Sequence, residues 1–302
     1  MRCHTPLLCA LGVLCSAVHG WQQPSALPSN RSASEPPSAT RALAAYDPSR
    51  ALQFAYFAGA AYCDLDTVAS WTCSKCVAAD PSFTAKTFTN ASTQMNAFVG
   101  FGSGEIVVSF RGTSNLENWI DNLQFSKRSV FPKCEGCEVH SGFFKTWLSM
   151  SSGVTSEVQR LHQLHPEASI YITGHSLGAA VAGVCALDLS TSSSSLAQSI
   201  AGVYTYGQPR LGNAAFAAFF EQRIRMSWRM THWRDPVPHL PFESMGFLHS
   251  ATEVFYNSDS SAYVVCDGSG EDPTCSNSLY FDYNIDDHLH YLDPPAGRIS
   301  RC

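Results

Sequence analysis

The pentapeptide Gly174-His175-Ser176-Leu177-Gly178 is the part of the sequence whose residue types and spacing point most clearly to chemistry. A β-rich run precedes it and a run of small and apolar residues follows, so Ser176 is expected on a tight turn between a strand and a helix. Small flanking residues let strand and helix approach, and the serine hydroxyl then stands exposed at the helix N-terminus. The amide of Leu177 can donate there to a developing oxyanion. The pattern predicts a serine nucleophile; an ordinary strand-to-helix turn is the alternative.

A serine in this setting needs an acid and then a histidine further along the chain. The expected strand 226–232 ends before a proline-rich segment, which makes Asp235 the candidate acid just past the strand. His232 precedes the acid, so we expect it to pack or to form hydrogen bonds. The base must come from a loop nearer the C-terminus. Position alone leaves four histidines open: His239, His249, His288 and His290.

The elements that must position these residues are visible as alternating strand and helix patterns. A helix is expected to begin at Asp47, as N-cap, and to run to about Tyr62. A hairpin is expected to join two strands through Gly102-Ser-Gly104, and the Ser/Thr run 191–195 is expected to be a surface loop within one domain. The hairpin strands are expected at 96–101 and 105–110. Further strands are expected at 139–140, 169–173, 202–206 and 226–232, and further helices at 143–162, 177–189 and 214–222. This alternation predicts an α/β fold with a mostly parallel sheet covered by helices.

The first 45 residues have a different composition. Arg2 and His4 precede an apolar run at 7–18, and small residues lead to Gly20, which predicts a secretory signal peptide over 1–20. Residues 21–45 are rich in Ser, Pro and Ala and are expected to form a pro-segment or linker. No later run reaches the roughly 20 apolar residues of a transmembrane helix. We therefore expect a secreted, extracellular protein without transmembrane anchoring.

Composition and charge limit the size of the core and the kinds of partner expected for the remaining domain, residues 46–302. The whole chain has 302 residues, of which 45% are hydrophobic and 15% charged, enough to close one large core. Removing residues 1–45 takes away three basic side chains and one acidic one, so the net charge of −6 becomes about −8 on the domain. An acidic domain is not expected to bind nucleic acid or anionic membranes electrostatically. Glycosylation sequons begin at Asn30 and Asn90.

Nine cysteines remain after the signal peptide, so one thiol must be free. Cys185 lies in an apolar helical pattern and is the expected buried thiol. In an exported chain, the close spacings favour small-loop disulfides over the alternative of a four-cysteine zinc site, and we expect no metal and no organic cofactor. The expected pairs are Cys63–Cys302, Cys73–Cys76, Cys134–Cys137 and Cys266–Cys275.

From about Asp47 the chain resembles the class 3 lipase family, the secreted fungal-type triacylglycerol lipases, which also contains feruloyl esterases. The motifs that carry the resemblance are Phe110-Arg-Gly-Thr113, His140-Ser-Gly-Phe143, Gly174-His-Ser-Leu-Gly178, Tyr206-Gly-Gln-Pro-Arg-Leu-Gly212, His232-Trp-Arg-Asp-Pro-Val-Pro-His-Leu-Pro241 and Asp287-His-Leu-His-Tyr291. The resemblance implies an α/β-hydrolase fold with Ser176 as nucleophile, Asp235 as acid and His288 as base. It also implies Thr113 as the oxyanion-hole residue beside Leu177. Ala179 stands where many family lipases have glycine, which leaves the subfamily open.

A short amphipathic segment directly follows Thr113. Its apolar residues recur at i, i+3, i+4 and i+7, namely Leu116, Trp119, Ile120 and Leu123. The segment resembles the family's lid, which would cover the acyl pocket when closed and meet lipid when open. A fixed core helix is the alternative. Because feruloyl esterases of the family carry a more polar segment here, Trp119 and Ile120 favour a lipase.

The sequence therefore predicts an exported, monomeric triacylglycerol lipase that cleaves carboxylic esters of acylglycerols at an oil–water interface through a Ser-His-Asp triad and an acyl-enzyme. A feruloyl esterase or a phospholipase A1 with the same triad is the alternative among enzymes. A catalytically silent lipid-binding protein is the alternative from another class.

Overall fold

The computed structural model describes residues 45–302 except 193, 280–282 and 293–297. The predicted signal peptide, the predicted pro-segment up to residue 44 and the Asn30 sequon lie outside the described residues. Within those ranges, no helix has the length and apolar character needed to cross a membrane.

An eight-stranded sheet forms the centre of the fold, in the order β1-β2-β3-β6-β7-β8-β9-β10. Its five middle strands run parallel: β3 (Glu105–Phe110), β6 (Ser169–His175), β7 (Ile200–Tyr206), β8 (Ser227–His232) and β9 (Glu253–Tyr256). The outer strands are antiparallel to their neighbours: β1 (Thr84–Asn90), β2 (Met95–Gly102) and β10 (Tyr263–Val265). A separate pair joins β4 (Lys127–Arg128) to β5 (Val139–His140). The predicted mostly parallel sheet is confirmed.

The predicted hairpin joins β2 to β3. Gly102 pairs with Glu105, and the two residues between them, Ser103 and Gly104, have positive φ angles of 47° and 79°. Two successive residues with positive φ form the tight turn whose twist matches that of antiparallel strands.

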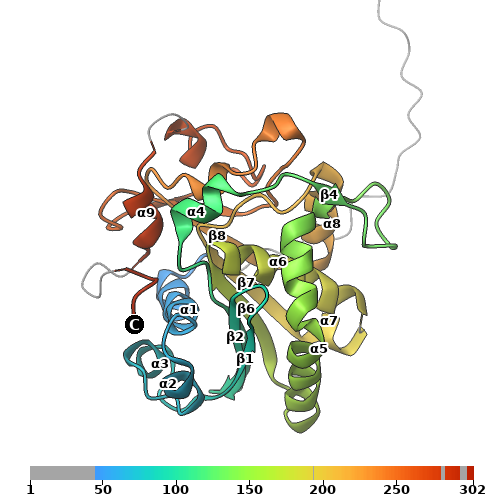
Figure 1. The fold of residues 1–302 in the computed structure, drawn as a ribbon, viewed down its shortest axis with the longest axis vertical. Coiled ribbons are helices and arrows are strands. Elements are labelled where there is room, and N and C mark those ends of the chain that lie inside the picture. Colours follow the sequence, from blue (N-terminus) through green and yellow to red (C-terminus); the bar gives the residue numbers. More distant parts are fainter. Residues whose placement is uncertain (1–44, 193, 280–282, 293–297) are drawn as a thin grey trace, which may run out of the picture. The chain divides into compact units, whose positions relative to one another are not determined.

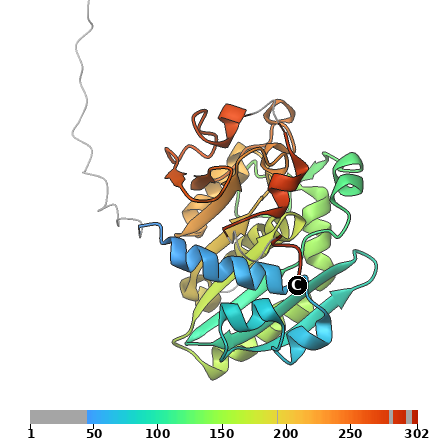
Figure 2. The same ribbon diagram turned by 90° about the vertical axis from the view of Figure 1, so that its left-hand side faces the viewer.

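Helices cover both faces of the sheet (Figures 1 and 2). One face packs against α5 (Ser141–Leu164), α6 (Leu177–Ser192) and α8 (Ala214–Arg223). The other packs against α1 (Pro48–Ala60) and α3 (Ser74–Ala79), next to α2 (Leu65–Ala69). Adjacent strand residues point to opposite cores: Val108 packs on the α6 side and Val107 on the α1 side.

The Ser/Thr run 191–195 is not the predicted surface loop. Helix α6 continues through Ser192, and α7 (Ser194–Ser199) begins two residues later. The hydroxyls of Ser190 and Thr191 donate to the carbonyl of Leu187 at 2.7 and 3.0 Å. These bonds satisfy the hydroxyls within the helix, so α6 extends into the first two residues of the polar run.

The described residues contain four disulfides, which are the four pairs named from the sequence: Cys63–Cys302, Cys73–Cys76, Cys134–Cys137 and Cys266–Cys275. The four cysteines of the zinc alternative are thereby paired with one another, which leaves their sulfurs unable to act as thiolate ligands. Cys185 is free and buried inside α6.

Candidate active site

Ser176 lies on the turn between β6 and α6, with a left-handed backbone (φ +61°). Its amide donates to the carbonyl of Tyr206 on the neighbouring strand at 2.9 Å. A Cβ atom at Gly174 would overlap the backbone of Gly178, and one at Gly178 would overlap the carbonyl oxygen of Phe110. Both positions therefore require glycine, and the strained turn points the serine out of the sheet.

Asp235 and His288 form a buried pair beyond the end of β8. The Nδ1 atom of His288 lies 2.7 Å from Oδ2 of Asp235, and each side chain is 1% exposed. The carboxylate also accepts from the amide of Val237 at 2.8 Å and from the hydroxyl of Tyr291. A carboxylate only accepts, so Nδ1 carries the proton and Nε2 keeps its lone pair.

The environment of Asp235 keeps it ionised. Burial opposes the charge, but the interaction with His288 outweighs it, together with the bonds from Tyr291 and Val237. The pKa of Asp235 is therefore lowered below its ordinary value. An ionised acid can orient the imidazole and stabilise its cation.

A pocket of about 500 Å³ brings the predicted residues together. Ser176, His288 and Thr113 line it, with Leu116 from α4 (Leu116–Asp121) and Ile285 from α9 (Ile285–Leu289). Ser176 Oγ and His288 Nε2 are both buried and have no hydrogen-bond partner among the described residues. Leu177 is not among the lining residues, but as the first residue of α6 its amide lies at the helix N-terminus.

The predicted lid segment forms the short helix α4. The side chain of Asn115 caps it by accepting from the amide of Asn118 at 3.1 Å. No residue of α4 is buried, which argues against the alternative of a fixed core helix. Trp119 and Leu123 are partly buried and pack on the core, where the Trp119 ring stacks 6.4 Å from that of Phe143. Leu116 faces the pocket, and Ile120 is half-buried.

The other histidines lie elsewhere. His232 bonds through Nδ1 to the carbonyl of Asp287 at 2.8 Å, the hydrogen-bonding role expected for it. His249 bonds to the carbonyl of Pro238, and His290 to that of Asp286, each at 2.8 Å. His239 is buried, and its ring lies 5.3 Å from that of Tyr283. Of the four histidines that position alone left as candidates, His288 is the one that forms a hydrogen bond with Asp235 among the described residues.

Sequence reasoning missed several residues that build this site. His175 lies between Tyr62, whose hydroxyl is 2.7 Å from Nδ1, and the carbonyl of His288, which is 2.8 Å from Nε2. Burial and the nearby His288 lower the pKa of His175 well below its ordinary value, so it stays neutral. Tyr291 belongs to a motif named above, but nothing in the sequence tied its hydroxyl to Asp235.

Asn90, the second sequon, ends β1. Its side-chain nitrogen donates to the carbonyl of Ser149 at 3.0 Å, and its oxygen accepts from the amides of Ser92 and Thr93. The side chain is half-buried.

Comparison with known proteins places this geometry in a family. The model of the lipase (class 3) family matches residues 107–245. A lipase of Rhizomucor miehei is 36% identical over 232 residues, which cover 76% of this chain and 64% of the relative. A lipase of Rhizopus niveus is 32% identical over 249 residues, 81% of this chain and 63% of the relative. The chain thus spans slightly less than two thirds of the length of these curated relatives. A secreted mono- and diacylglycerol lipase of Fusarium solani is 33% identical over 227 residues, 70% of this chain and 66% of the relative.

Two solved lipase structures superpose on this chain over nearly their whole length. Lipase II from Rhizopus niveus superposes with a TM-score of 0.78 at 31% identity, covering 84% of this chain and 96% of that one. The triacylglyceride lipase of Rhizomucor miehei superposes with a TM-score of 0.75 at 33% identity, covering 81% of this chain and 93% of that one. These matches confirm the predicted α/β-hydrolase fold, and the chain belongs to the class 3 lipase family.

Proposed function

We propose that this protein is a secreted triacylglycerol lipase in which Ser176, His288 and Asp235 form the catalytic triad. One observation carries the proposal. The buried Asp235–His288 pair presents an unpartnered Nε2 on the same pocket as Ser176, whose hydroxyl is also without a partner in the described chain. Two unsatisfied buried groups on one pocket are what a site awaiting an ester would contain.

The first half of the reaction forms an acyl-enzyme. His288 Nε2 takes the proton from Ser176 Oγ as Oγ bonds to the ester carbonyl carbon, and the carbonyl electron pair moves to its oxygen. The amides of Leu177 and Thr113, with the Thr113 hydroxyl, donate to that oxyanion. When the carbonyl re-forms, the bond to the alcohol breaks, and His288 returns the proton to the leaving oxygen.

The second half releases the acid. Water gives a proton to His288 while its oxygen attacks the acyl carbon, and the second tetrahedral intermediate then expels Ser176 Oγ, which takes the proton back. Asp235 stays ionised throughout and stabilises the imidazolium. Each step uses side chains and backbone amides of this chain together with water.

The contacts of α4 support a gating role for it. The amide of Asn115, its N-cap, donates to Thr113 Oγ1 at 3.2 Å, so helix and oxyanion-hole residue are directly linked. Leu116 and Glu117 border the pocket that holds Ser176. We propose that α4 moves away at a lipid surface and exposes the apolar side chains of Leu116, Trp119, Ile120 and Leu123.

The test is hydrolysis of emulsified triolein, tributyrin, diolein, phosphatidylcholine and methyl ferulate by the purified protein, with Ser176→Ala as control. The proposal expects the acylglycerols to be preferred and the tributyrin rate to jump above the solubility limit. Diolein is included because relatives are named mono- and diacylglycerol lipases. Preference for methyl ferulate or phosphatidylcholine would favour the corresponding esterase or phospholipase, and no hydrolysis would favour a lipid-binding protein.

Export and oligomeric state belong to the same proposal. We propose that the chain is secreted after removal of residues 1–20 and acts as a monomer. N-terminal sequencing of protein recovered from the medium of a secreting host tests the first statement. Light scattering of the purified protein tests the second, and a mass of twice the chain or more would contradict it.

A further inference from the structure

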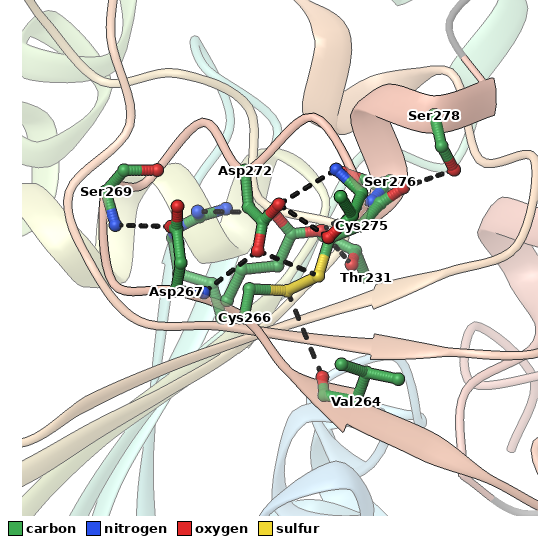
Figure 3. The surroundings of a disulfide bond; sticks show 12 residues. Thr231, Val264, Cys266, Asp267, Ser269, Asp272, Cys275, Ser276 and Ser278 are labelled. Atoms are coloured by element: carbon green, nitrogen blue, oxygen red, sulfur yellow. Dashed lines mark hydrogen bonds and ion pairs between the residues drawn. A yellow bond between two sulfur atoms is a disulfide. The ribbon is translucent and has the colours of Figure 1, made fainter.

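The Cys266–Cys275 disulfide closes a loop, residues 266–275, that is ordered by its own polar groups. We call it the disulfide loop (Figure 3). Asp272 accepts from the amides of Asp267 and Thr274 at 2.9 and 2.8 Å. The loop is closed by a covalent bond and braced from inside, so its backbone positions are well defined.

Two buried arginines reach the disulfide loop from the sheet side. Arg229 Nη2 donates to the carbonyl of Gly270 at 3.0 Å. Arg210 holds both carboxylate oxygens of Glu271 at 2.7 Å, through Nε and Nη2. The Arg210 side chain is 0% exposed and that of Glu271 14%. Burial opposes the charge of Glu271, but the bond and charge of Arg210 prevail and lower its pKa well below the ordinary value.

Arg210 and His249 bind four consecutive backbone carbonyls, those of residues 238–241, in the segment that follows Asp235. Arg210 Nη1 donates to the carbonyls of His239 and Pro241 at 2.7 and 3.1 Å, and the Arg210 amide donates to that of Leu240 at 2.7 Å. His249, whose amide donates to Glu271 at 2.8 Å, bonds through Nε2 to the carbonyl of Pro238, also at 2.8 Å.

This segment contains the turn that positions the acid. It begins with the short helix η1 (Val237–His239), and the amide of Val237 is one of the donors to the Asp235 carboxylate. Glu271 orients the guanidinium of Arg210 and the backbone of His249, and these two residues bind carbonyls 238–241. A displacement of Glu271 would therefore reach Asp235 through these hydrogen bonds and the backbone of residues 237–241.

We propose that Arg210 is a positioning residue for Asp235, and that the disulfide loop holds Arg210 in place through Glu271. The inference rests on the proposed function, because it takes Asp235 as the acid of the triad. Neutralising Glu271, or letting it move in the opened loop, weakens the bidentate bond. Arg210 Nη2 then keeps Glu243, 3.3 Å away and 45% exposed, as its carboxylate partner, so we expect the guanidinium to reorient and release carbonyls of the segment. The catalytic acid then loses its fixed position.

The test compares Glu271→Gln and Cys266→Ser/Cys275→Ser with matched controls on a soluble ester such as p-nitrophenyl butyrate. Glu157→Gln is the control for Glu271→Gln. Glu157 is a buried carboxylate on α5, where it pairs with Arg160. Cys73→Ser/Cys76→Ser is the control for the second, since it opens a short disulfide at α3. Glu271→Asp, which keeps the carboxylate, is the conservative variant.

We expect kcat to fall about tenfold in Glu271→Gln and in the opened loop, with KM within about twofold of wild type, because small misplacements of catalytic groups act on kcat. Glu271→Asp should recover part of the loss, and both controls should keep kcat even where thermal stability falls. If the Cys266→Ser/Cys275→Ser variant does not fold, the Glu271→Gln and Glu271→Asp variants still test the inference, because their disulfide loop remains closed.

Unchanged kcat in Glu271→Gln, or an equal loss in Glu157→Gln, would overturn the inference. Failure of the proposed function is a separate outcome. If the triad assignment fails, the wild-type protein hydrolyses no p-nitrophenyl butyrate, and if only the substrate class is wrong, the emulsion assay shows it while the comparison of variants still stands. A loss of thermal stability alone, with kcat retained, would show that the cluster is structural and would also overturn the inference.

Discussion

Gly207 offers a sharp perturbation of the candidate site, because it lies against the His288–Asp235 pair and is not among the residues that line the pocket. It follows β7 with φ +57°. A Cβ atom at this position would lie 2.6 Å from Cε1 and 2.7 Å from Nδ1 of His288, and 2.9 Å from Oδ2 of Asp235. Gly207→Ala therefore places a methyl group where the imidazole stands.

The size of the effect follows from these distances. Carbon atoms touch at about 3.5 Å, so the ring must move by about 1 Å to accept the methyl group. A misplacement of about 1 Å in a catalytic group lowers the rate by about 100-fold. The left-handed backbone adds about 1–2 kcal/mol of destabilisation for a residue with a Cβ. We expect kcat/KM for p-nitrophenyl butyrate to fall about 100-fold while the protein stays folded in urea titrations.

Gly104→Ala separates the two contributions. Gly104 has φ +79° and no atom within 4 Å of the position of an added Cβ, so this variant carries the backbone penalty alone. It should lose similar stability and keep wild-type kcat/KM. Wild-type activity in folded Gly207→Ala, or an equal loss in Gly104→Ala, would refute the account of how the imidazole is held.

Three further predictions concern other parts of the domain. Tyr291→Phe removes a hydrogen bond to the ionised Asp235, worth about 2 kcal/mol, so kcat/KM should fall by up to about 30-fold; initial rates equal to wild type would contradict this. Burial lowers the pKa of His140 from 6.5 to about 4. As the pH falls between these two values, the unfolded chain binds a proton that the folded protein does not, so about 3 kcal/mol of folding stability is lost. His140→Asn, which keeps a capping acceptor but does not titrate, should lack this loss in urea titrations at pH 7 and pH 4. Replacing Cys63 and Cys302 by serine should lower the unfolding free energy by about 4 kcal/mol, and a loss under about 1 kcal/mol would contradict the disulfide's role.

Local patterns made the nucleophile predictable. The strand, the two glycines and the small-residue helix around Ser176 are contiguous, so their steric requirement can be read along the chain. Four of the five parallel strands, β3, β6, β7 and β8, could be identified because they are largely buried on both faces and carry mostly apolar or β-branched residues. The Ser/Thr run 191–195, which lies in the end of α6 and the start of α7, misled the prediction because hydroxyls bonded to backbone carbonyls are compatible with a helix.

Three strands of the eight-stranded sheet were missed for a related reason, and the two-residue strand β4 was also missed. β1 is an edge strand of mostly polar residues, β10 is a short exposed edge strand, and β9 begins with the buried Glu253. None of them has the continuous apolar run that marked the central strands. Edge strands with solvent on one side carry a weaker sequence signal than buried ones.

Long-range partners account for the rest of what the sequence left open. The choice of His288 among four histidines depends on which one the fold brings to Asp235, 53 positions earlier. Tyr291 and Arg210 act through bonds to residues 56 and 61 positions away. Such pairs are fixed by the packing of whole elements, so no local pattern contains them.

Covalent labelling tests the central claim most directly. The purified protein is treated with a p-nitrophenyl alkylphosphonate, and the modified peptide is identified by mass spectrometry in wild type, Ser176→Ala and His288→Ala. We expect one phosphonyl group on Ser176, none in Ser176→Ala and much slower labelling in His288→Ala. A label on another residue, or labelling of Ser176→Ala at the wild-type rate, would contradict the assignment of Ser176 as the nucleophile.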